Sequence, residues 1–203
     1  MLRRACLRHG LGALVGIAGA PVAWAGAQKE EHLADSVRTA MSAAVRLSSE
    51  PPVPVLATWH EQQYYQRWLH AMNARLGARM VNDFTRLEFL QTVWYEAARA
   101  ALDVSLVLGL IQVESNFRKY AISSVGARGL MQVMPFWVNA IGDGDASKLF
   151  HQQTNLRFGC SILQYYLHRE NGNLFMALGR YNGSRGRDTY PNAVFAAQKQ
   201  WAL

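Results

Sequence analysis

The feature that most constrains this chain is an apolar run that holds a single carboxylate. Residues 104–117 read Val-Ser-Leu-Val-Leu-Gly-Leu-Ile-Gln-Val-Glu-Ser-Asn-Phe, and Glu114 is the one charged residue among them. Asp103, directly before the run, can cap a helix, so we expect a buried helix with Glu114 near its far end. Burial disfavours an ionised carboxylate and raises its pKa. Glu114 is therefore predicted to hold a proton at neutral pH, as a general acid must.

The spacing of apolar residues elsewhere predicts an all-α fold, because few β-branched runs alternate with period two. With the caps and breakers around them, these residues predict helices over residues 28–50 (a weak pattern), 58–76, 83–101, 135–142, 154–169, 173–182 and 191–201. In the 58–76 helix, core packing of the aromatic stripe is favoured over a sugar-binding platform. In the next helix Asp83 is the expected cap. Its expected core face is Phe84, Leu87, Leu90, Trp94 and Ala98.

The N-terminus has the pattern of a secretory signal peptide over residues 1–25, with cleavage after residue 27 as a variant. A basic segment with Arg3, Arg4 and Arg8 precedes a short Gly/Ala-rich apolar run and small residues at Ala23 and Ala25. A membrane anchor is the alternative, but the run falls short of the ~20 residues that a spanning helix needs. We therefore expect a periplasmic protein with no stable membrane span after processing. Residues 26–80 are predicted to be a helical extension with a proline-rich linker.

Removal of the signal peptide would lower the formal net charge from +7 to +4, and the basic residues are dispersed. This balance suits an acidic polymer without requiring one, and it gives little support for nucleic-acid binding. Cys6 would leave with the signal peptide. Cys160, in an apolar helical pattern, is predicted to be a buried structural thiol.

No second carboxylate can be placed beside Glu114. Asp103 lies about 16 Å away along the same helix at ~1.5 Å per residue, beyond the ~5–9.5 Å of paired glycosidase carboxylates. Asp143 and Asp145 are predicted to be solvated turn residues, and Glu170 and Asp188 flank loops. The histidines are scattered, so neither a metal site nor a cofactor is predicted. One acid without a partner fits chemistry in which the substrate supplies the second group.

Four separated motifs resemble those of the soluble lytic transglycosylase (SLT) domain family, which has a lysozyme-like, goose-type fold. They are Glu114-Ser115, residues 121–135 (Ala-Ile-Ser-Ser-Val-Gly-Ala-Arg-Gly-Leu-Met-Gln-Val-Met-Pro), Asn155 with Gly159, and Tyr181-Asn182-Gly183. They stand in the family's order, and the resemblance covers about residues 87–201. It implies an SLT domain over residues 81–203.

The resemblance also implies roles for particular residues. Glu114 matches the single catalytic acid/base of peptidoglycan lytic transglycosylases. These enzymes cleave the MurNAc–GlcNAc β-1,4 bond and form 1,6-anhydro-MurNAc with help from the substrate's own acetamido group. The matching substrate-binding positions are Ser123, Gln132, Met134, Tyr181 and Asn182. One departure is Arg180, where the family commonly has a small residue; we expect it to point outward, away from Glu114.

Two other functions are compatible with these motifs. A hydrolytic goose-type lysozyme would keep the fold, and a non-enzymatic cell-wall-binding scaffold would keep the binding groups. The expected partners are peptidoglycan glycan strands. The compact organisation of the chain further suggests a wall-opening enzyme for an envelope-spanning secretion or conjugation apparatus.

Overall fold

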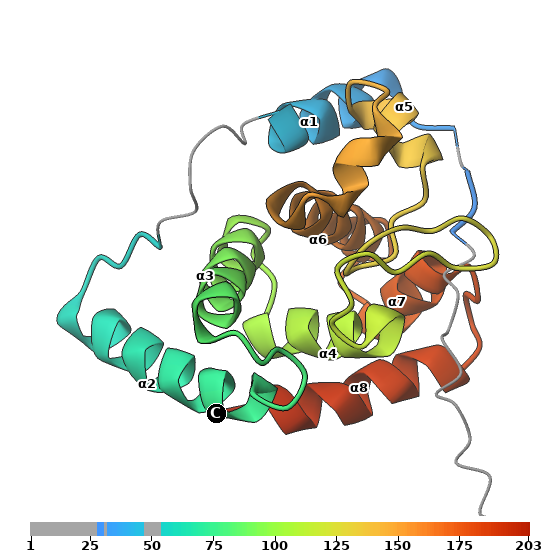
Figure 1. Cartoon of the computed structure of the whole chain (residues 1–203). Helices are drawn as coiled ribbons and strands as arrows, with labels where there is room; N and C mark the ends of the chain where they lie inside the picture. Colours follow the sequence, from blue (N-terminus) through green and yellow to red (C-terminus); the bar gives the residue numbers. More distant parts are fainter. Residues whose placement is uncertain (1–27, 31, 47–53) are drawn as a thin grey trace, which may run out of the picture.

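The computed structural model describes residues 28–30, 32–46 and 54–203, and these form helices joined by loops (Figure 1). The elements are α1 (Asp35–Arg46), α2 (Trp59–Leu76), α3 (Asp83–Arg99), α4 (Val104–Ser115), α5 (Phe136–Ile141), the 3-10 helix η1 (Ala146–Phe150), α6 (Gln152–Arg169), α7 (Leu174–Asn182) and α8 (Thr189–Trp201). Within the described ranges, β structure is limited to two isolated bridges, both at Arg128. The all-α prediction is confirmed. The predicted signal peptide and most of the proline cluster lie outside the described residues.

Helix α4 forms the buried centre that its apolar run predicts. Asp103 caps it, accepting a hydrogen bond from the Leu106 N–H at 2.9 Å. Helix α8 crosses α4 at Gly109, where a Cβ atom would lie 2.7 Å from the Gln198 backbone nitrogen. The two helix backbones can approach this closely only because Gly109 has no side chain. The crossing brings the start of α8 to the end of α4 that carries Glu114.

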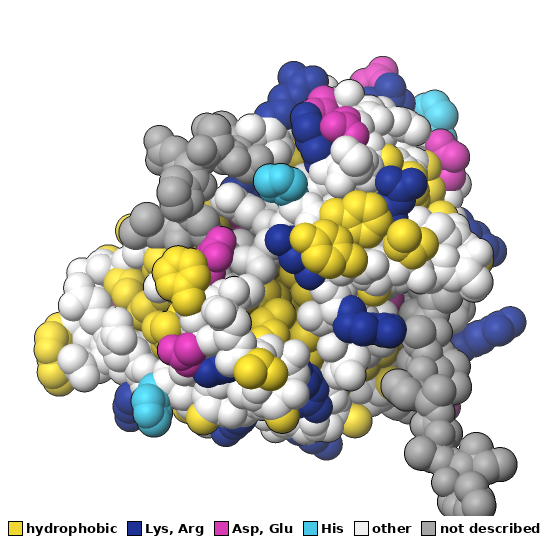
Figure 2. All heavy atoms as spheres, viewed as in Figure 1, with side chains coloured by type: hydrophobic (Ala, Val, Ile, Leu, Met, Phe, Trp, Pro, Cys, Tyr) yellow, Lys and Arg dark blue, Asp and Glu magenta, His cyan; other side chains and the backbone are white. Residues whose placement is uncertain are grey.

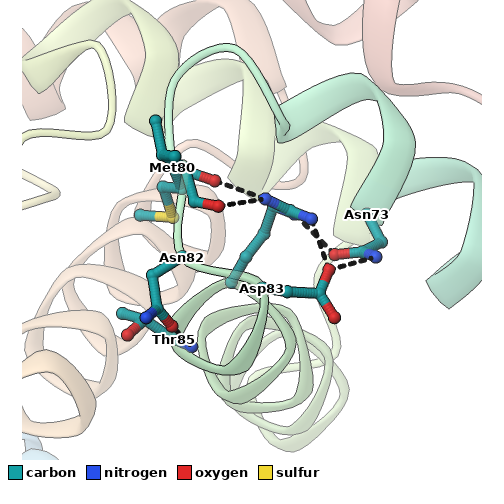
Figure 3. A network of polar contacts seen from close by, with 7 residues as sticks. Asn73, Met80, Asn82, Asp83 and Thr85 are labelled. Atoms are coloured by element: carbon teal, nitrogen blue, oxygen red, sulfur yellow. Dashed lines mark hydrogen bonds and ion pairs between the residues drawn. The ribbon is translucent and has the colours of Figure 1, made fainter.

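A buried arginine ties the α2–α3 corner together. Arg86 donates through Nε to the Asn73 side chain at 2.5 Å and through Nη1 to the Met80 carbonyl at 2.5 Å, and it pairs with Asp83. Figure 3 shows Asn73, Met80 and Asp83 around this network. The predicted capping role of Asp83 is wrong, since Asn82 is the N-cap and accepts from the Thr85 N–H.

The predicted core face of α3 is only partly right. Leu90 is buried, but Phe84 is 78% exposed and Ala98 is also exposed. The buried face is Arg86, Phe89, Leu90, Thr92, Val93, Glu96 and Ala97. The apolar pattern misplaced the face because two charged residues, Arg86 and Glu96, occupy core positions.

Glu96 is the centre of a buried ionic cluster. Its Oε1 accepts from Arg157 Nη2 at 2.7 Å, and its Oε2 accepts from Arg99 Nε at 2.7 Å. Glu96 and Arg157 are both at most 1% exposed. The cluster joins α3 to α6, and Arg99 also donates to the Ala44 carbonyl, which brings α1 into the same assembly.

The helix predicted over residues 28–50 is shorter than expected, since α1 begins at Asp35 and residues 28–30 and 32–34 are not helical. Other helix bounds differ from expectation by a few residues. Helix α6 begins at Gln152 and α8 begins at Thr189, two residues ahead of Pro191. The 3-10 helix η1 was not predicted. In α2, Tyr65, Trp68, Met72 and Leu76 are buried as the core interpretation requires, while Trp59 is 66% exposed. No described helix combines the length and apolar character needed to cross a membrane.

Candidate active site

Glu114 lies one residue before the end of α4 and is 2% exposed. The Tyr190 hydroxyl, from the first turn of α8, donates to Glu114 Oε1 at 2.5 Å. Glu114 Oε2 is buried and has no hydrogen-bond partner among the described residues. Burial raises the pKa of Glu114 to about 8, against a smaller lowering by the Tyr190 hydrogen bond. The carboxyl group therefore carries a proton at neutral pH, as its apolar sequence surroundings predicted.

No other charged group of the described residues shifts this pKa. Arg180 pairs instead with Glu170, which Arg185 also holds at 2.8 Å. Arg185 and Arg180 hold the pKa of Glu170 to about 2, although its burial opposes them. Arg180 thus pairs with Glu170 and not with Glu114, but with its side chain only 20% exposed it does not extend outward into solvent as expected. No carboxylate of the described residues contributes to the raised pKa of Glu114.

The loop that follows α4 is fastened to α6 by one buried amide. Asn155 Oδ1 accepts from the Met131 N–H, and its Nδ2 donates to the Arg128 and Leu149 carbonyls, each at 2.8 Å. Gly129 has φ +77°, and a Cβ atom there would lie 2.3 Å from Asn155 Nδ2. Glycine is therefore required at this position both for backbone conformation and for space. Asn155 thereby fixes the loop that carries Gln132 and Met134.

Three predicted binding residues lie on this loop. The Gln132 amide donates to the Gly129 carbonyl at 2.8 Å and the Ala121 carbonyl at 3.2 Å, so it braces the loop from within. Ser123 Oγ accepts from the Ala127 N–H at 3.0 Å. Met134 is partly buried, and its N–H points to the Gln28 side chain at 3.3 Å. Sugar contact by these residues stays a prediction.

Tyr181 and Asn182 come from the end of α7. Tyr181 is fully buried, and its hydroxyl donates to the Met131 carbonyl at 2.8 Å. Burial and, next, the nearby Glu114 raise the pKa of Tyr181 well above 10. Asn182 Nδ2 donates to Ser184 Oγ at 3.0 Å, while its Oδ1 is buried without a partner in the described part of the chain. Tyr181 thus lies close to Glu114, but the hydroxyl that hydrogen-bonds to the Glu114 carboxyl group is that of Tyr190.

Tyr190 was missed from the sequence. It follows the turn at residues 183–188 and precedes Pro191, so nothing in its local pattern separates it from a packing residue. Its partner lies 76 residues earlier in the chain. One feature of the sequence could have drawn attention to Tyr190. It stands in the first turn of a helix that begins soon after Tyr181-Asn182.

A basic pocket of about 400 Å³ lies beside the Asn182-Gly183 turn. Its charged lining residues are Lys29, Arg180, Arg185 and Arg187. Lys and Arg side chains are otherwise spread over the face seen in Figure 2. In the described residues, no three His, Cys, Asp or Glu side chains gather in a way that could hold a metal ion.

Comparisons with known proteins show which family the chain belongs to. Residues 92–203 match the transglycosylase SLT domain family. Membrane-bound lytic murein transglycosylase C of Mannheimia succiniciproducens is 34% identical over 105 residues, which cover 48% of this chain and 29% of that protein. The transglycosylase of Enterobacteria phage PRD1 is 34% identical over 97 residues, covering 48% of this chain and 35% of that protein.

The matched part is thus about a third or less of the length of these relatives. A crystal structure of an inactive mutant of the lytic transglycosylase Slt from Pseudomonas aeruginosa aligns with a TM-score of 0.44 and 22% identity, covering 69% of this chain and 27% of that one. The family match spans Glu114, the loop up to Pro135, Asn155, Tyr181 and Tyr190. This chain belongs to the transglycosylase SLT domain family.

Proposed function

We propose that the chain is a lytic transglycosylase that cleaves the MurNAc–GlcNAc bond of peptidoglycan and leaves a 1,6-anhydro end. The observation that carries the proposal is the buried Glu114, which is protonated near neutral pH and whose pKa receives no contribution from a second carboxylate of the described residues. Membership of the SLT family supports the same reaction.

In the first step, protonated Glu114 donates its proton to the oxygen that links the two sugars. Tyr190 occupies Oε1, so Oε2 is the oxygen left to carry and deliver the proton. The bond from C1 of MurNAc to that oxygen breaks, and the acetamido oxygen of the same MurNAc residue attacks C1. Protonation of the leaving oxygen is needed because an unprotonated sugar alkoxide leaves slowly.

In the second step, the Glu114 carboxylate takes a proton from the C6 hydroxyl of that sugar. The C6 oxygen attacks C1 and displaces the acetamido oxygen, which closes the 1,6-anhydro ring. The proton returns to Glu114, so the enzyme is restored without water. One residue acts as acid and then as base, which is consistent with the finding that no second carboxylate of the described residues affects the pKa of Glu114.

Digestion of purified sacculi followed by mass spectrometry of the fragments tests the proposal. We expect 1,6-anhydro ends from the native chain and none from Glu114→Gln. Glu88→Gln, the same change at an exposed site on α3, is the matched control and should digest normally. Fragments with free reducing ends would identify a lysozyme instead. Equal digestion by Glu114→Gln would overturn the catalytic assignment.

We further propose a periplasmic location, with residues 1–25 or 1–27 removed on export. The basic and apolar pattern of that segment supports it. Cell fractionation with N-terminal sequencing of the purified protein checks both location and cleavage site; an intact Met1 in the cytoplasm would overturn them. A secretion or conjugation apparatus stays the predicted partner. A pull-down with α1 and α2 as bait, and with them deleted, would test it.

A further inference from the structure

Residues 28–30 and 32–33 lie between the candidate active site and the start of α1, and we call them the strap; residue 31 is outside the described residues. Gln28 and Leu33, near its two ends, are 5% and 3% exposed, while Lys29, Glu30 and His32 are exposed. Leu33 belongs to the hydrophobic core, and its carbonyl accepts from Arg38. Between its buried ends the strap borders a hollow of about 430 Å³ over α5. Gln28 and Leu33 are therefore the residues of the strap that are packed against the domain.

The Gln28 side chain lies against the loop that follows α4 and contacts two of the predicted substrate-binding residues, Met134 and Tyr181. Its Oε1 accepts from the Met134 N–H at 3.3 Å. The preceding N–H groups of the loop, at Met131, Gln132 and Val133, all donate to groups of the SLT domain itself, so Met134 is the one whose acceptor comes from the strap. The same side chain makes a polar contact with the Tyr181 hydroxyl, which lies close enough to Glu114 to feel its charge.

The bonding of Gln28 is incomplete. Its amide nitrogen is buried and makes no hydrogen bond of good geometry with the described residues. A buried polar atom without a partner costs free energy, so this residue fits the position less well than a ligand with matching groups would. The burial of Glu114 Oε2 also means that a sugar cannot reach the acid until some part of the surroundings moves.

A glutamine side chain ends in a carboxamide, which presents the same carbonyl oxygen and N–H as an acetamido group. The proposed substrate carries an acetamido group on the carbon next to the bond that breaks, so this group must enter beside Glu114. We propose that Gln28 occupies the place of the substrate's acetamido group, and that the strap is an autoinhibitory segment which glycan must displace. This inference rests on the proposed function.

Steady-state kinetics with the full chain and peptidoglycan glycan strands test the strap. Gln28→Ala removes the competing carboxamide and should lower KM about two- to tenfold, the range that one net hydrogen bond sets. The value of kcat should stay unchanged, because the strap is absent from the bound complex. Glu30→Ala, an exposed change within the strap, is the matched control and should leave both constants unchanged. An unchanged or raised KM for Gln28→Ala, or a lowered kcat, would overturn the proposal.

A binding measurement separates this inference from the catalytic one. The backbone N–H signal of Met134 is followed by NMR while a chito-oligosaccharide, or its de-N-acetylated form, is added. We expect the N-acetylated sugar to shift this signal, at two- to tenfold lower concentration in Gln28→Ala than in the native chain, and the de-N-acetylated sugar to leave it in place. Equal affinity of the two proteins for the N-acetylated sugar would overturn the autoinhibitory role of the strap, even if sacculi are digested. Tighter binding of the N-acetylated sugar by Gln28→Ala, without any digestion of sacculi, would overturn only the proposed function.

Discussion

The protonation of Glu114, the proposed general acid, also determines how the stability of the fold depends on pH. Its pKa is about 8 when folded, against 4.5 ordinarily. Between these values the folded chain binds more protons than the unfolded chain, so stability falls as pH rises across this window. We expect Glu114→Gln to remove this slope, roughly 1.4 kcal/mol per pH unit. Urea unfolding at pH 5 and pH 8 checks this. The free energy of unfolding of Glu114→Gln minus that of the native chain should be larger at pH 8 than at pH 5.

Tyr190 is a positioning residue, and Tyr190→Phe tests how it acts. Its hydrogen bond lowers the pKa of Glu114, so its loss should move the alkaline limb of the activity profile from about pH 8 to higher pH. Activity at the optimum should fall on the order of tenfold, as expected for a hydrogen bond to a group that ionises during reaction. A pH–rate profile is the measurement. A loss of activity with an unmoved limb would reduce Tyr190 to a packing role.

At the residue scale, the sequence predicted the buried, protonated carboxyl group of Glu114 but not Tyr190, which hydrogen-bonds to it. Glu114 was visible because a carboxylate in an apolar run is locally anomalous. Tyr190 and Gln28 were not, because their importance arises from contacts made 76 and 106 residues away along the chain. Local patterns carry no information about which helices cross.

At the scale of elements, the crossing of α4 and α8 depends on Gly109. Gly109→Ala should destabilise the fold by about 1–3 kcal/mol, because its methyl group would collide with the backbone near Gln198. It should also lower activity by displacing Tyr190. Gly77→Ala, at the end of α2, is the matched control: its φ is −51° and its nearest contact is 3.4 Å. Urea unfolding compares the two, and an equal effect would show that the crossing is not tight.

The sequence was sufficient to predict which segments are helical. It was sufficient to predict which face of a helix is buried only where that face is made of apolar residues. The stripe of α2 faces the core as expected, apart from Trp59. In α3 the face was wrong, because Arg86 and Glu96 take buried positions and are compensated by partners from other elements. The η1 turn escaped notice since a 3-10 segment of this length has no periodicity to detect.

At the scale of the whole molecule, the Glu96 cluster joins α3, α6 and α1 in the core. Glu96→Gln leaves Arg157 buried without its counter-charge and should cost about 3–5 kcal/mol of stability. Glu88→Gln, exposed on the same helix, should change stability by less than about 0.5 kcal/mol. Urea unfolding is the measurement. If Glu96→Gln lowers the free energy of unfolding no more than the control does, the Glu96–Arg157 ion pair does not stabilise the fold.

Cys160 offers a way to watch the whole molecule open. It is the free cysteine of the described residues, it is fully buried on α6, and burial raises the pKa of its thiol far above the usual range. A thiol-alkylating reagent therefore has no reactive target there while the core is closed, and the labelling rate measures global unfolding. Displacement of the strap should leave that rate unchanged. A mass-tagged time course thus distinguishes loss of the fold, which exposes Cys160 to the reagent, from displacement of the strap, which does not.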